Sequence, residues 1–402
     1  MRSSILKFAK RLEPIKPSAT LAVTTQAKRL KAEGHDVLSF AAGEPDFPTP
    51  PFVVDAMVKA ARDGATGYAP VLGLPALRGA VARHFTDLYD TPFEASNIAV
   101  SVGGKHSLYN LFQILVDPGD EVIVPAPYWV SYPAQIRLAE GEPVIVDSDM
   151  EQGFVIRPED IEAAITDRTV GIVLNSPANP SGAVQPVEVV GALADLVERH
   201  DLWLITDDIY SHIRYDDSPF INVLRERPDL RDRIIVVHGA SKTYAMTGWR
   251  IGFTAARPDL IAKMGILQGQ STSNPTHFAQ HGALAAIESD HSFLVPWLSA
   301  YDARRRRLVE MANAIEGVSC FMPGGAFYAF PDLRGVLGKR LGDTVIDSSM
   351  KFCEALLEHA MVAAVPGEPF GAPGFMRVSY ACSMEDVETG MTRIAEFIGR
   401  LE

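Results

Sequence analysis

The sequence predicts an α/β fold, with a mainly parallel sheet covered by helices and a smaller α+β domain beside it. Short runs rich in Val and Ile, bounded by Gly, Pro, Asn or Asp, predict buried strands. These runs are 98–102, 121–125, 170–174, 202–206 and 234–238. Amphipathic stretches between them, such as 106–115 and 187–200, predict helices. Continuous apolar strands that alternate with helices are typical of a parallel sheet covered on both faces.

Residues from about 290 onward follow a different pattern. A basic helix around Arg304–Arg307, expected to present a solvated face, is followed by apolar runs at 324–330, 361–367 and 375–381 and a helical run at 347–359. We therefore expect three parts: 1–48 as an N-terminal arm and part of the small domain, 49–290 as the large ligand-binding domain, and 291–402 as the C-terminal small domain.

Composition excludes several classes of function. The 402 residues are 47% hydrophobic and carry a formal net charge of −13, so no broad basic surface and no nucleic-acid partner are expected. No run of about 18 apolar residues occurs, and the N-terminus lacks the apolar stretch of a signal peptide. We expect no membrane partner and a cytoplasmic location.

Metal and disulfide chemistry are not expected either. The cysteines Cys320, Cys353 and Cys382 are scattered without a CxxC spacing, which favours reduced, buried thiols. His277 and His281 are four residues apart, but no glutamate follows the first, so a helix with packed or solvated histidines is the better interpretation.

Residues that are able to bind a ligand follow each of the five predicted strands. Ligands of parallel α/β sheets bind beyond the carboxyl ends of the strands. A glycine pair that opens a helix suits a phosphate, because free N–H groups and the helix dipole favour an anion. Each feature alone has an ordinary explanation, such as a turn or a packed ring. In chain order they are Gly103-Gly104-Lys105, Tyr128-Trp129, Asn175 with Asn179, Asp207-Asp208 with Tyr210, and Ser241-Lys242.

Pyridoxal phosphate is a ligand that uses all of these groups together. Its aldehyde binds a lysine amine, a carboxylate keeps its pyridine nitrogen protonated, and its phosphate suits a helix N-terminus. Their convergence at one edge of the sheet therefore predicts a pyridoxal-phosphate site, with Lys242 as the attachment point and Asp207 at the ring nitrogen.

Motifs along nearly the whole chain, from 16–23 to 377–383, strengthen this interpretation. They include AAGEPDFPTP, GYAPVLGLPALR, SVGGKHSLYNLF, NSPANPSGAV, TDDIY, SKTYAMTGWRIGF and GGAFY. With these motifs the chain resembles the fold-type I aminotransferases of class I, and most closely the bacterial subgroup of aspartate and prephenate aminotransferases. The resemblance implies a fold-type I large domain, pyridoxal 5′-phosphate as cofactor, and a homodimer with shared active sites.

The resemblance also implies roles in cofactor binding and catalysis. Lys242 would hold the cofactor and carry the proton, Asp207 would pair with the pyridine nitrogen, and Asn179 and Tyr210 would bind the ring hydroxyl. Trp129 would stack on the ring. Gly239 stands where many relatives have a serine near the phosphate, a contact that Ser241 would replace. The other phosphate contacts would come from Gly103, Gly104, Arg250, and Tyr68 reaching across from the neighbouring subunit.

Substrate recognition is implied in the same way. Arg377 would bind the substrate α-carboxylate, because a guanidinium fork matches a carboxylate bidentately. Gly43, Asn179 and Trp129 would lie beside it. Lys105, within the cofactor pocket, would bind the distal carboxylate of aspartate or glutamate, with Ser18 and Thr20 as helpers. We therefore expect a ping-pong exchange between a dicarboxylic amino acid and 2-oxoglutarate or oxaloacetate.

Alternatives within the same cofactor chemistry stay open. Prephenate aminotransferases of this subgroup carry a basic residue just before the KPSAT segment, where this chain has Glu13-Pro14-Ile15. That difference argues against prephenate or another aromatic substrate without excluding it. A β-elimination lyase would use the same lysine and aspartate. A nucleotide-binding P-loop is rejected, because Gly104-Lys105 is followed by His106 rather than Ser or Thr.

Overall fold

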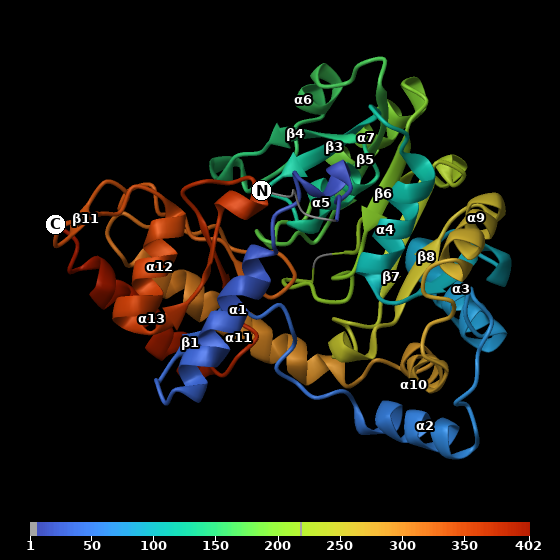
Figure 1. Cartoon of the computed structure of the whole chain (residues 1–402), viewed down its shortest axis with the longest axis horizontal. Helices are drawn as coiled ribbons and strands as arrows, with labels where there is room; N and C mark the ends of the chain where they lie inside the picture. The colour runs from blue at the N-terminus through green and yellow to red at the C-terminus, as the bar shows by residue number, and fades with distance from the viewer. Residues whose placement is uncertain (1–5, 218) are drawn as a thin grey trace.

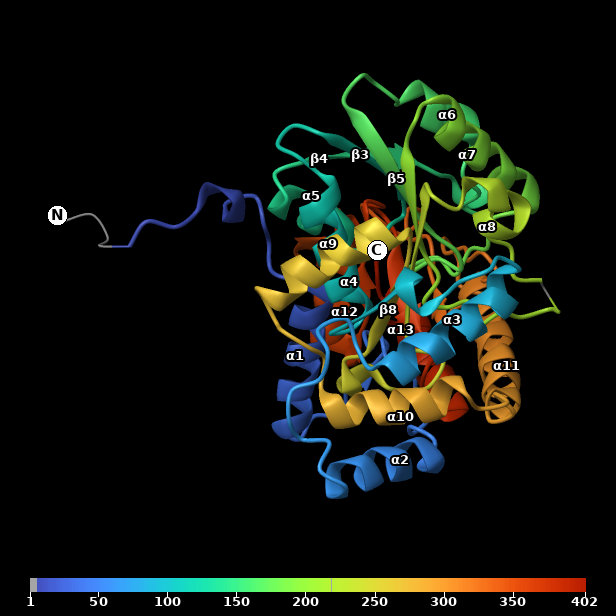
Figure 2. The same cartoon turned by 90° about the vertical axis from the view of Figure 1, so that its right-hand side faces the viewer.

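The computed structural model describes residues 6–217 and 219–402. Figure 1 shows two lobes: a large one around the main sheet, and a smaller one that holds the C-terminal helices together with α1 (Ala19–Ala32). Residues 6–18, the described residues before α1, extend outward from the rest of the chain, as Figure 2 shows.

The large lobe is built on a mixed sheet. Within the described residues, seven strands lie in the order β2-β8-β7-β6-β5-β3-β4. Neighbours are parallel except at β8, which is antiparallel to both β2 and β7. The mainly parallel α/β class is therefore confirmed, and so are the five predicted strands. They are β2 (Ile98–Ser101), β3 (Glu121–Ala126), β5 (Thr169–Asn175), β6 (Trp203–Asp207) and β7 (Ile234–Gly239).

Two strands of this sheet escaped the sequence pattern. β4 (Glu142–Asp147) is the edge strand beside β3, and its apolar run, Val144–Val146, is only three residues long and follows Pro143. β8 (Gly252–Ala255) has only four residues, and it begins with Gly and ends with Ala, which are depleted in strands, yet all four are buried between β2 and β7. Pairing on both sides thus stabilises a short segment that begins and ends with poor strand formers.

Helices cover both faces of the sheet because successive strand side chains point to opposite sides. In β7, Ile234 and Val236 join one apolar cluster, while Ile235 and Val237 join another. The first face is covered by α3 (Pro75–Tyr89), α7 (Val187–Arg199), α8 (Val223–Glu226) and α10 (His277–Ile287), with α2 (Pro51–Arg62) and α6 (Pro158–Ala163) at its margins. The second is covered by α4 (Gly104–Leu115), α5 (Ser131–Leu138) and α9 (Pro258–Gly269).

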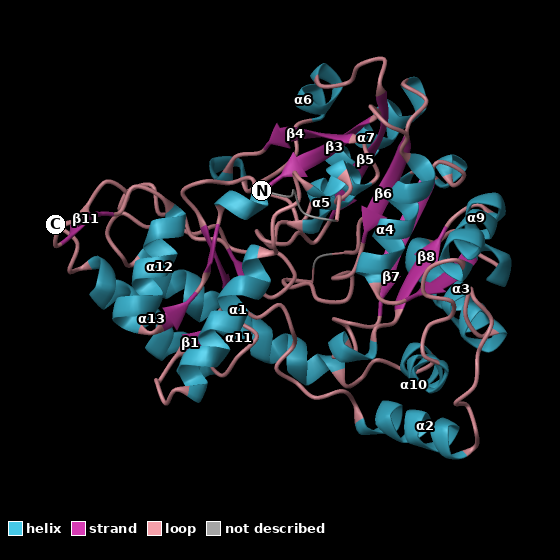
Figure 3. Cartoon of the chain, viewed as in Figure 1, coloured by secondary structure: helices cyan, strands magenta, loops and turns pink. Residues whose placement is uncertain are grey.

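The small lobe has its own apolar core, formed mainly by three helices against short strands (Figure 3). The helices are α11 (Leu294–Asn313), α12 (Ser349–Ala360) and α13 (Met384–Ile398). The strands are β9 (Tyr328–Ala329), β12 (Val362–Ala363), β13 (Val365–Pro366) and β14 (Met376–Ser379), with the hairpin β10 (Arg340–Leu341) and β11 (Thr344–Val345). β1 (Leu38–Ser39) pairs in parallel with β12, which joins the N-terminal segment to this lobe. The boundaries at 48 and 290 stay a prediction.

The expected solvated face at Arg304–Arg307 is wrong in part. The Arg305 side chain is fully buried, and it donates to Asp302, to both carboxylate oxygens of Asp216 at 2.8 and 2.9 Å, and to the Pro323 carbonyl at 2.6 Å. Its guanidinium also lies over the Tyr215 ring, 4.4 Å from the centroid. The ion pairs compensate the burial of the charge, a tertiary arrangement that a run of arginines does not reveal.

The sequence predicts reduced, buried thiols, no metal site and no membrane-spanning segment. Cys320 and Cys353 are buried and free, whereas Cys382 is free but partly exposed. No helix among the described residues is long and apolar enough to cross a membrane. In the same part of the chain, no group of three or more His, Cys, Asp or Glu side chains is arranged to hold a metal ion.

Candidate active site

One cavity of about 620 Å³ lies where the carboxyl ends of β5, β6 and β7 meet the start of α4 and the inner face of α1. It brings together most of the residues predicted from the sequence. Those lining it are Ser18, Thr20, Gly43, Gly104, Lys105, Trp129, Asn179, Asp207, Tyr210, Ser241, Lys242, Arg250 and Arg377. Tyr68 lies elsewhere: it is 93% exposed and lines a different cavity with Thr272 and Asn274.

Lys242 follows β7 and places its amine inside the cavity. Nζ donates a hydrogen bond to the Gly43 carbonyl, which fixes the direction of the side chain. Burial lowers the pKa of Lys242 to about 8, and the nearby guanidinium groups of Arg377 and Arg250 also lower it. A substantial fraction of this amine is therefore neutral, and nucleophilic, at pH values where a surface lysine is fully charged.

Asp207 closes β6 with its carboxylate buried at the floor of the cavity. Burial raises its pKa to about 6, while the Tyr132 hydroxyl, which donates to Oδ2 at 2.7 Å, and the Ile209 backbone N–H lower it. The adjacent Asp208 is bound instead by Tyr89 and Asn222 and does not line the cavity. Only the first acid of the Asp-Asp pair therefore serves this site.

Asparagine and tyrosine side chains connect the strand ends to one another. Asn175 donates from Nδ2 to the Asp207 carbonyl at 2.7 Å, and its Oδ1 accepts from the Asn179 N–H at 2.9 Å. The hydroxyl groups of Tyr210 and Tyr328 are 3.0 Å apart. Amide and phenol groups are thus held along one wall of the cavity before any ligand enters.

Arg377 is a buried cation, and no carboxylate among the described residues pairs with it. It is 2% exposed, and its two Nη atoms donate to Asn179 Oδ1 and to the Ala41 carbonyl, each at 3.0 Å. Its Nε has no hydrogen-bond partner. The guanidinium lies 4.4 Å from the Tyr328 ring centroid, and burial lowers its pKa. A buried guanidinium with an unused donor fits an incoming carboxylate.

The start of α4 forms an anion cradle with Arg250. Gly103 caps the helix with φ of 84°, and a Cβ built on it would lie 2.3 Å from Arg250 Nη2. Arg250 itself has a left-handed backbone (φ 58°) and donates to the Thr247 carbonyl at 2.7 Å. Only glycine permits this close approach, which places the guanidinium beside the free N–H groups of the helix.

Lys105 and Trp129 form the wall opposite the strand ends. Lys105 Nζ lies 4.9 Å from the Trp129 ring centroid, and burial together with Arg250 lowers the pKa of Lys105. The indole in turn meets the Tyr132 ring edge-on, with centroids 5.3 Å apart. The site therefore offers a flat aromatic surface with a cation over it.

Sequence reasoning missed several residues that line this cavity, notably Lys28, Glu44, Tyr132 and Tyr328. Tyr328 stands in the GGAFY motif, but nothing in the motif assigns it a contact. Tyr132 is three residues past Trp129, on a helix whose packing alone brings it to Asp207, 75 positions further along the chain. Lys28 follows the predicted Thr20 at twice the four-residue spacing of one helix face, with Thr24 between them, and this spacing is the one signal that the sequence offers for it.

These groups fit pyridoxal phosphate. The Lys242 amine, whose pKa is lowered, suits an aldehyde, and the buried carboxylate of Asp207 suits a protonated ring nitrogen. The anion cradle at Gly103 suits a phosphate. The orphan Nε of Arg377 suits the carboxylate of an amino acid.

Comparisons with known proteins agree with this chemistry. The family model for aminotransferase class I and II matches residues 35–394. An aspartate/prephenate aminotransferase of Nitrosomonas europaea is 44% identical, over 98% of this chain and 100% of its own. An aspartate aminotransferase of Geobacillus stearothermophilus is 42% identical, over 98% and 99%.

Solved structures of aspartate aminotransferases share the fold. The enzyme from Rhizobium meliloti superposes with a TM-score of 0.95 at 40% identity, covering 99% of this chain and 100% of its own. The Thermus thermophilus enzyme with maleate gives a TM-score of 0.92 at 40% identity, covering 98% and 100%. The chain therefore belongs to the class I and II aminotransferase family.

Proposed function

We propose that this chain is a pyridoxal-phosphate-dependent aminotransferase that moves the amino group between aspartate or glutamate and a 2-oxo acid. The observation that carries the proposal is the presence, in one cavity, of the Lys242 amine, the Asp207 carboxylate and the unpaired Arg377 guanidinium. Family membership and the names of the relatives support the same reaction.

When bound, pyridoxal phosphate supplies the aldehyde and the electron-withdrawing ring that make the α-proton of an amino acid removable. Asp207 would hold the ring nitrogen, while Asn179 and Tyr210 would hold the ring hydroxyl. Trp129 would cover one face of the ring. Gly103, Gly104, Ser241 and Arg250 would hold the phosphate.

Lys242 is the proton carrier in this proposal. A neutral amine is needed to take the α-proton, and the depressed pKa of about 8 keeps part of the population in that form near neutral pH. Nζ lies inside the cavity, with the Gly43 carbonyl beside it to orient its N–H groups, and would be placed there to carry the proton when the cofactor is bound. The catalytic set is therefore Lys242, Asp207 and Tyr210.

Two cations in the cavity match the two carboxylates of a dicarboxylic substrate. Arg377 binds the α-carboxylate with Gly43, Asn179 and Trp129 around it, and Lys105 binds the distal carboxylate across the cavity. The Thermus relative was solved with maleate, itself a dicarboxylate. Aspartate and glutamate present the same two charged groups.

A homodimer with shared sites completes the proposal. Tyr68 is 93% exposed, and it lines a second cavity with Thr272, Asn274 and His277 on the surface. An exposed phenol of this kind is available to reach the phosphate of a neighbouring subunit. The domain boundaries and the cytoplasmic location stay predictions.

The test is a single-turnover experiment on the cofactor-loaded protein. Aspartate, glutamate, alanine, phenylalanine and arogenate, the amino product of prephenate, are added separately, and the visible absorbance of the bound cofactor is followed. Fast loss of the band with aspartate and glutamate supports the proposal. A faster reaction with arogenate would move the assignment to prephenate, which the name of the Nitrosomonas relative favours as the second candidate. A separate addition of β-chloroalanine, which carries a leaving group on its β-carbon, tests the lyase alternative: release of chloride, pyruvate and ammonia would indicate β-elimination instead.

A further inference from the structure

The strongest feature that these roles leave unused is the phenol of Tyr132. Its side chain lies at the start of α5, is 2% exposed, and donates to Asp207 Oδ2 at 2.7 Å. The bond joins residues 75 positions apart, between a helix on one face of the sheet and the end of β6. It is therefore a tertiary contact that holds the carboxylate at the floor of the cavity.

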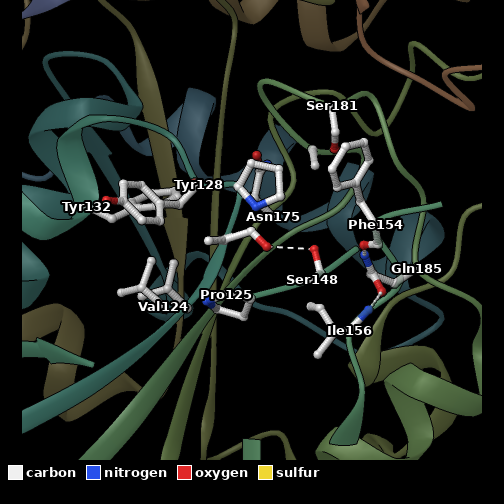
Figure 4. A pocket seen from close by; sticks show the side chains of 14 residues that line it. Val124, Pro125, Tyr128, Tyr132, Ser148, Phe154, Ile156, Asn175, Ser181 and Gln185 are labelled. Atoms are coloured by element: carbon white, nitrogen blue, oxygen red, sulfur yellow. Dashed lines mark hydrogen bonds between the residues drawn. The ribbon is translucent and has the colours of Figure 1, made fainter. Parts of the chain in front are cut away.

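The Tyr132 ring packs edge-on against Trp129 in the main cavity. It also lines a second, small cavity of about 30 Å³ together with Tyr128 and Asn175 (Figure 4). Asn175 in turn holds the Asp207 backbone carbonyl at 2.7 Å. Asp207 is thus held at its backbone by Asn175, and its carboxylate is bound by the Tyr132 hydroxyl at Oδ2 and by the Ile209 backbone N–H.

We propose that Tyr132 is a positioning residue for the cofactor: by occupying Oδ2 of Asp207, its hydroxyl leaves the other carboxylate oxygen directed at the pyridine nitrogen and keeps the carboxylate ionised. This inference rests on the proposed function, because it assigns the pyridine nitrogen to Asp207. In this proposal Tyr132 acts through Asp207, to which its hydroxyl donates, and is assigned no contact with the reacting atoms.

The charges around Asp207 show why a donor is required there. The titratable groups that face it are Tyr132 from α5, Tyr89 from α3, Lys242 after β7, and Tyr210 and Asp208 from its own segment. Burial raises the pKa of Asp207 to about 6 even with the hydrogen bond in place. Without the hydroxyl, the carboxyl would retain its proton at higher pH, and a protonated carboxyl cannot stabilise a protonated pyridine nitrogen.

Tyr89→Phe provides a matched control. The Tyr89 hydroxyl donates to Asp208 Oδ2 at 3.0 Å, and both groups are buried. Tyr132→Phe and Tyr89→Phe therefore remove the same kind of bond from adjacent acids, of which only Asp207 lines the cavity. The measured quantity is the Kd of pyridoxal phosphate for each cofactor-free protein at pH 6 and pH 9, expressed as the ratio of variant to wild type, so that titration of Lys242 cancels.

The expected ratio follows from the strength of the lost bond. A hydrogen bond to a charged group changes an equilibrium about 10- to 100-fold, so the ionisation of Asp207 moves upward by that factor. The Kd ratio for Tyr132→Phe is then about 5–50 at pH 6 and falls toward 1 at pH 9, where the carboxylate is ionised in both proteins. Tyr89→Phe is expected to stay within about threefold at both pH values.

Each other outcome overturns the inference. A Tyr132→Phe ratio near 1 at pH 6, the same ratio at both pH values, or an equal loss in Tyr89→Phe would assign the hydroxyl a purely structural role. A Tyr132→Phe chain that fails to fold while Tyr89→Phe folds would do the same. Failure of the wild-type chain to bind pyridoxal phosphate would instead refute the proposed function itself.

Discussion

Gly252→Ala tests whether the anion cradle depends on close contact between two backbones. A Cβ at position 252 would lie 2.3 Å from the Gly103 carbonyl carbon and 2.4 Å from the Gly104 nitrogen. Ordinary contact begins near 3.4 Å, so the start of α4 would have to move by about 1 Å away from β8. Overpacking of this kind costs about 1–3 kcal/mol of unfolding free energy.

Cofactor binding should fall more steeply than stability. The displaced start of α4 would lose one N–H hydrogen bond to a charged phosphate, worth about 1.5–3 kcal/mol, which weakens pyridoxal-phosphate binding about 10- to 100-fold. Urea unfolding of the cofactor-free protein and a cofactor titration measure the two effects. Gly191→Ala is the control, because its Cβ would meet nothing within 4 Å and alanine stabilises a helix interior by about 1 kcal/mol. Wild-type cofactor affinity in Gly252→Ala would refute the reasoning.

Three further predictions follow from the site and the small lobe. Uptake of pyridoxal phosphate by the cofactor-free protein should accelerate as pH rises through about 8, the lowered pKa of Lys242, because only the neutral amine attacks the aldehyde. Stopped-flow uptake rates that rise with an apparent pKa near 10 would contradict this. Lys105→Ala should raise the KM for aspartate about 10- to 100-fold and leave that for alanine unchanged, whereas an unchanged aspartate KM would remove the proposed role of Lys105. Arg305→Met should lower the free energy of unfolding by about 1–3 kcal/mol and leave the cofactor affinity unaltered. The loss is moderate because the unpaired Asp216 is half exposed rather than buried. Equal stability of variant and wild type in urea would show that these ion pairs contribute no net stability.

The strands that deliver the site could be predicted because they are continuous apolar runs. β5, β6 and β7 are buried on both faces, so their composition alone identifies them, and the polar residues directly after each run mark the ligand edge. This pattern alone identifies Asp207 and Lys242 as candidate ligand-binding residues, independently of any family resemblance.

The residues that were missed depend on tertiary packing. β8 is stabilised by its two neighbours rather than by its own composition, and Tyr132 reaches Asp207 only because α5 packs against that face of the sheet. Arg305 lies in a run of arginines and is buried because Asp216 and the Pro323 carbonyl meet it there. No local pattern carries such contacts, since both partners must be placed by distant parts of the chain.

The most direct test of the central claim is to locate the lysine that carries the cofactor. The protein loaded with pyridoxal phosphate is reduced with borohydride, digested, and mapped by mass spectrometry. Lys242, Lys105 and Lys28 all line the cavity, so the choice among them is not settled by proximity alone. We predict the label on Lys242, whose amine has its pKa lowered to about 8. Label on Lys105 or Lys28 with Lys242 unmodified would contradict it.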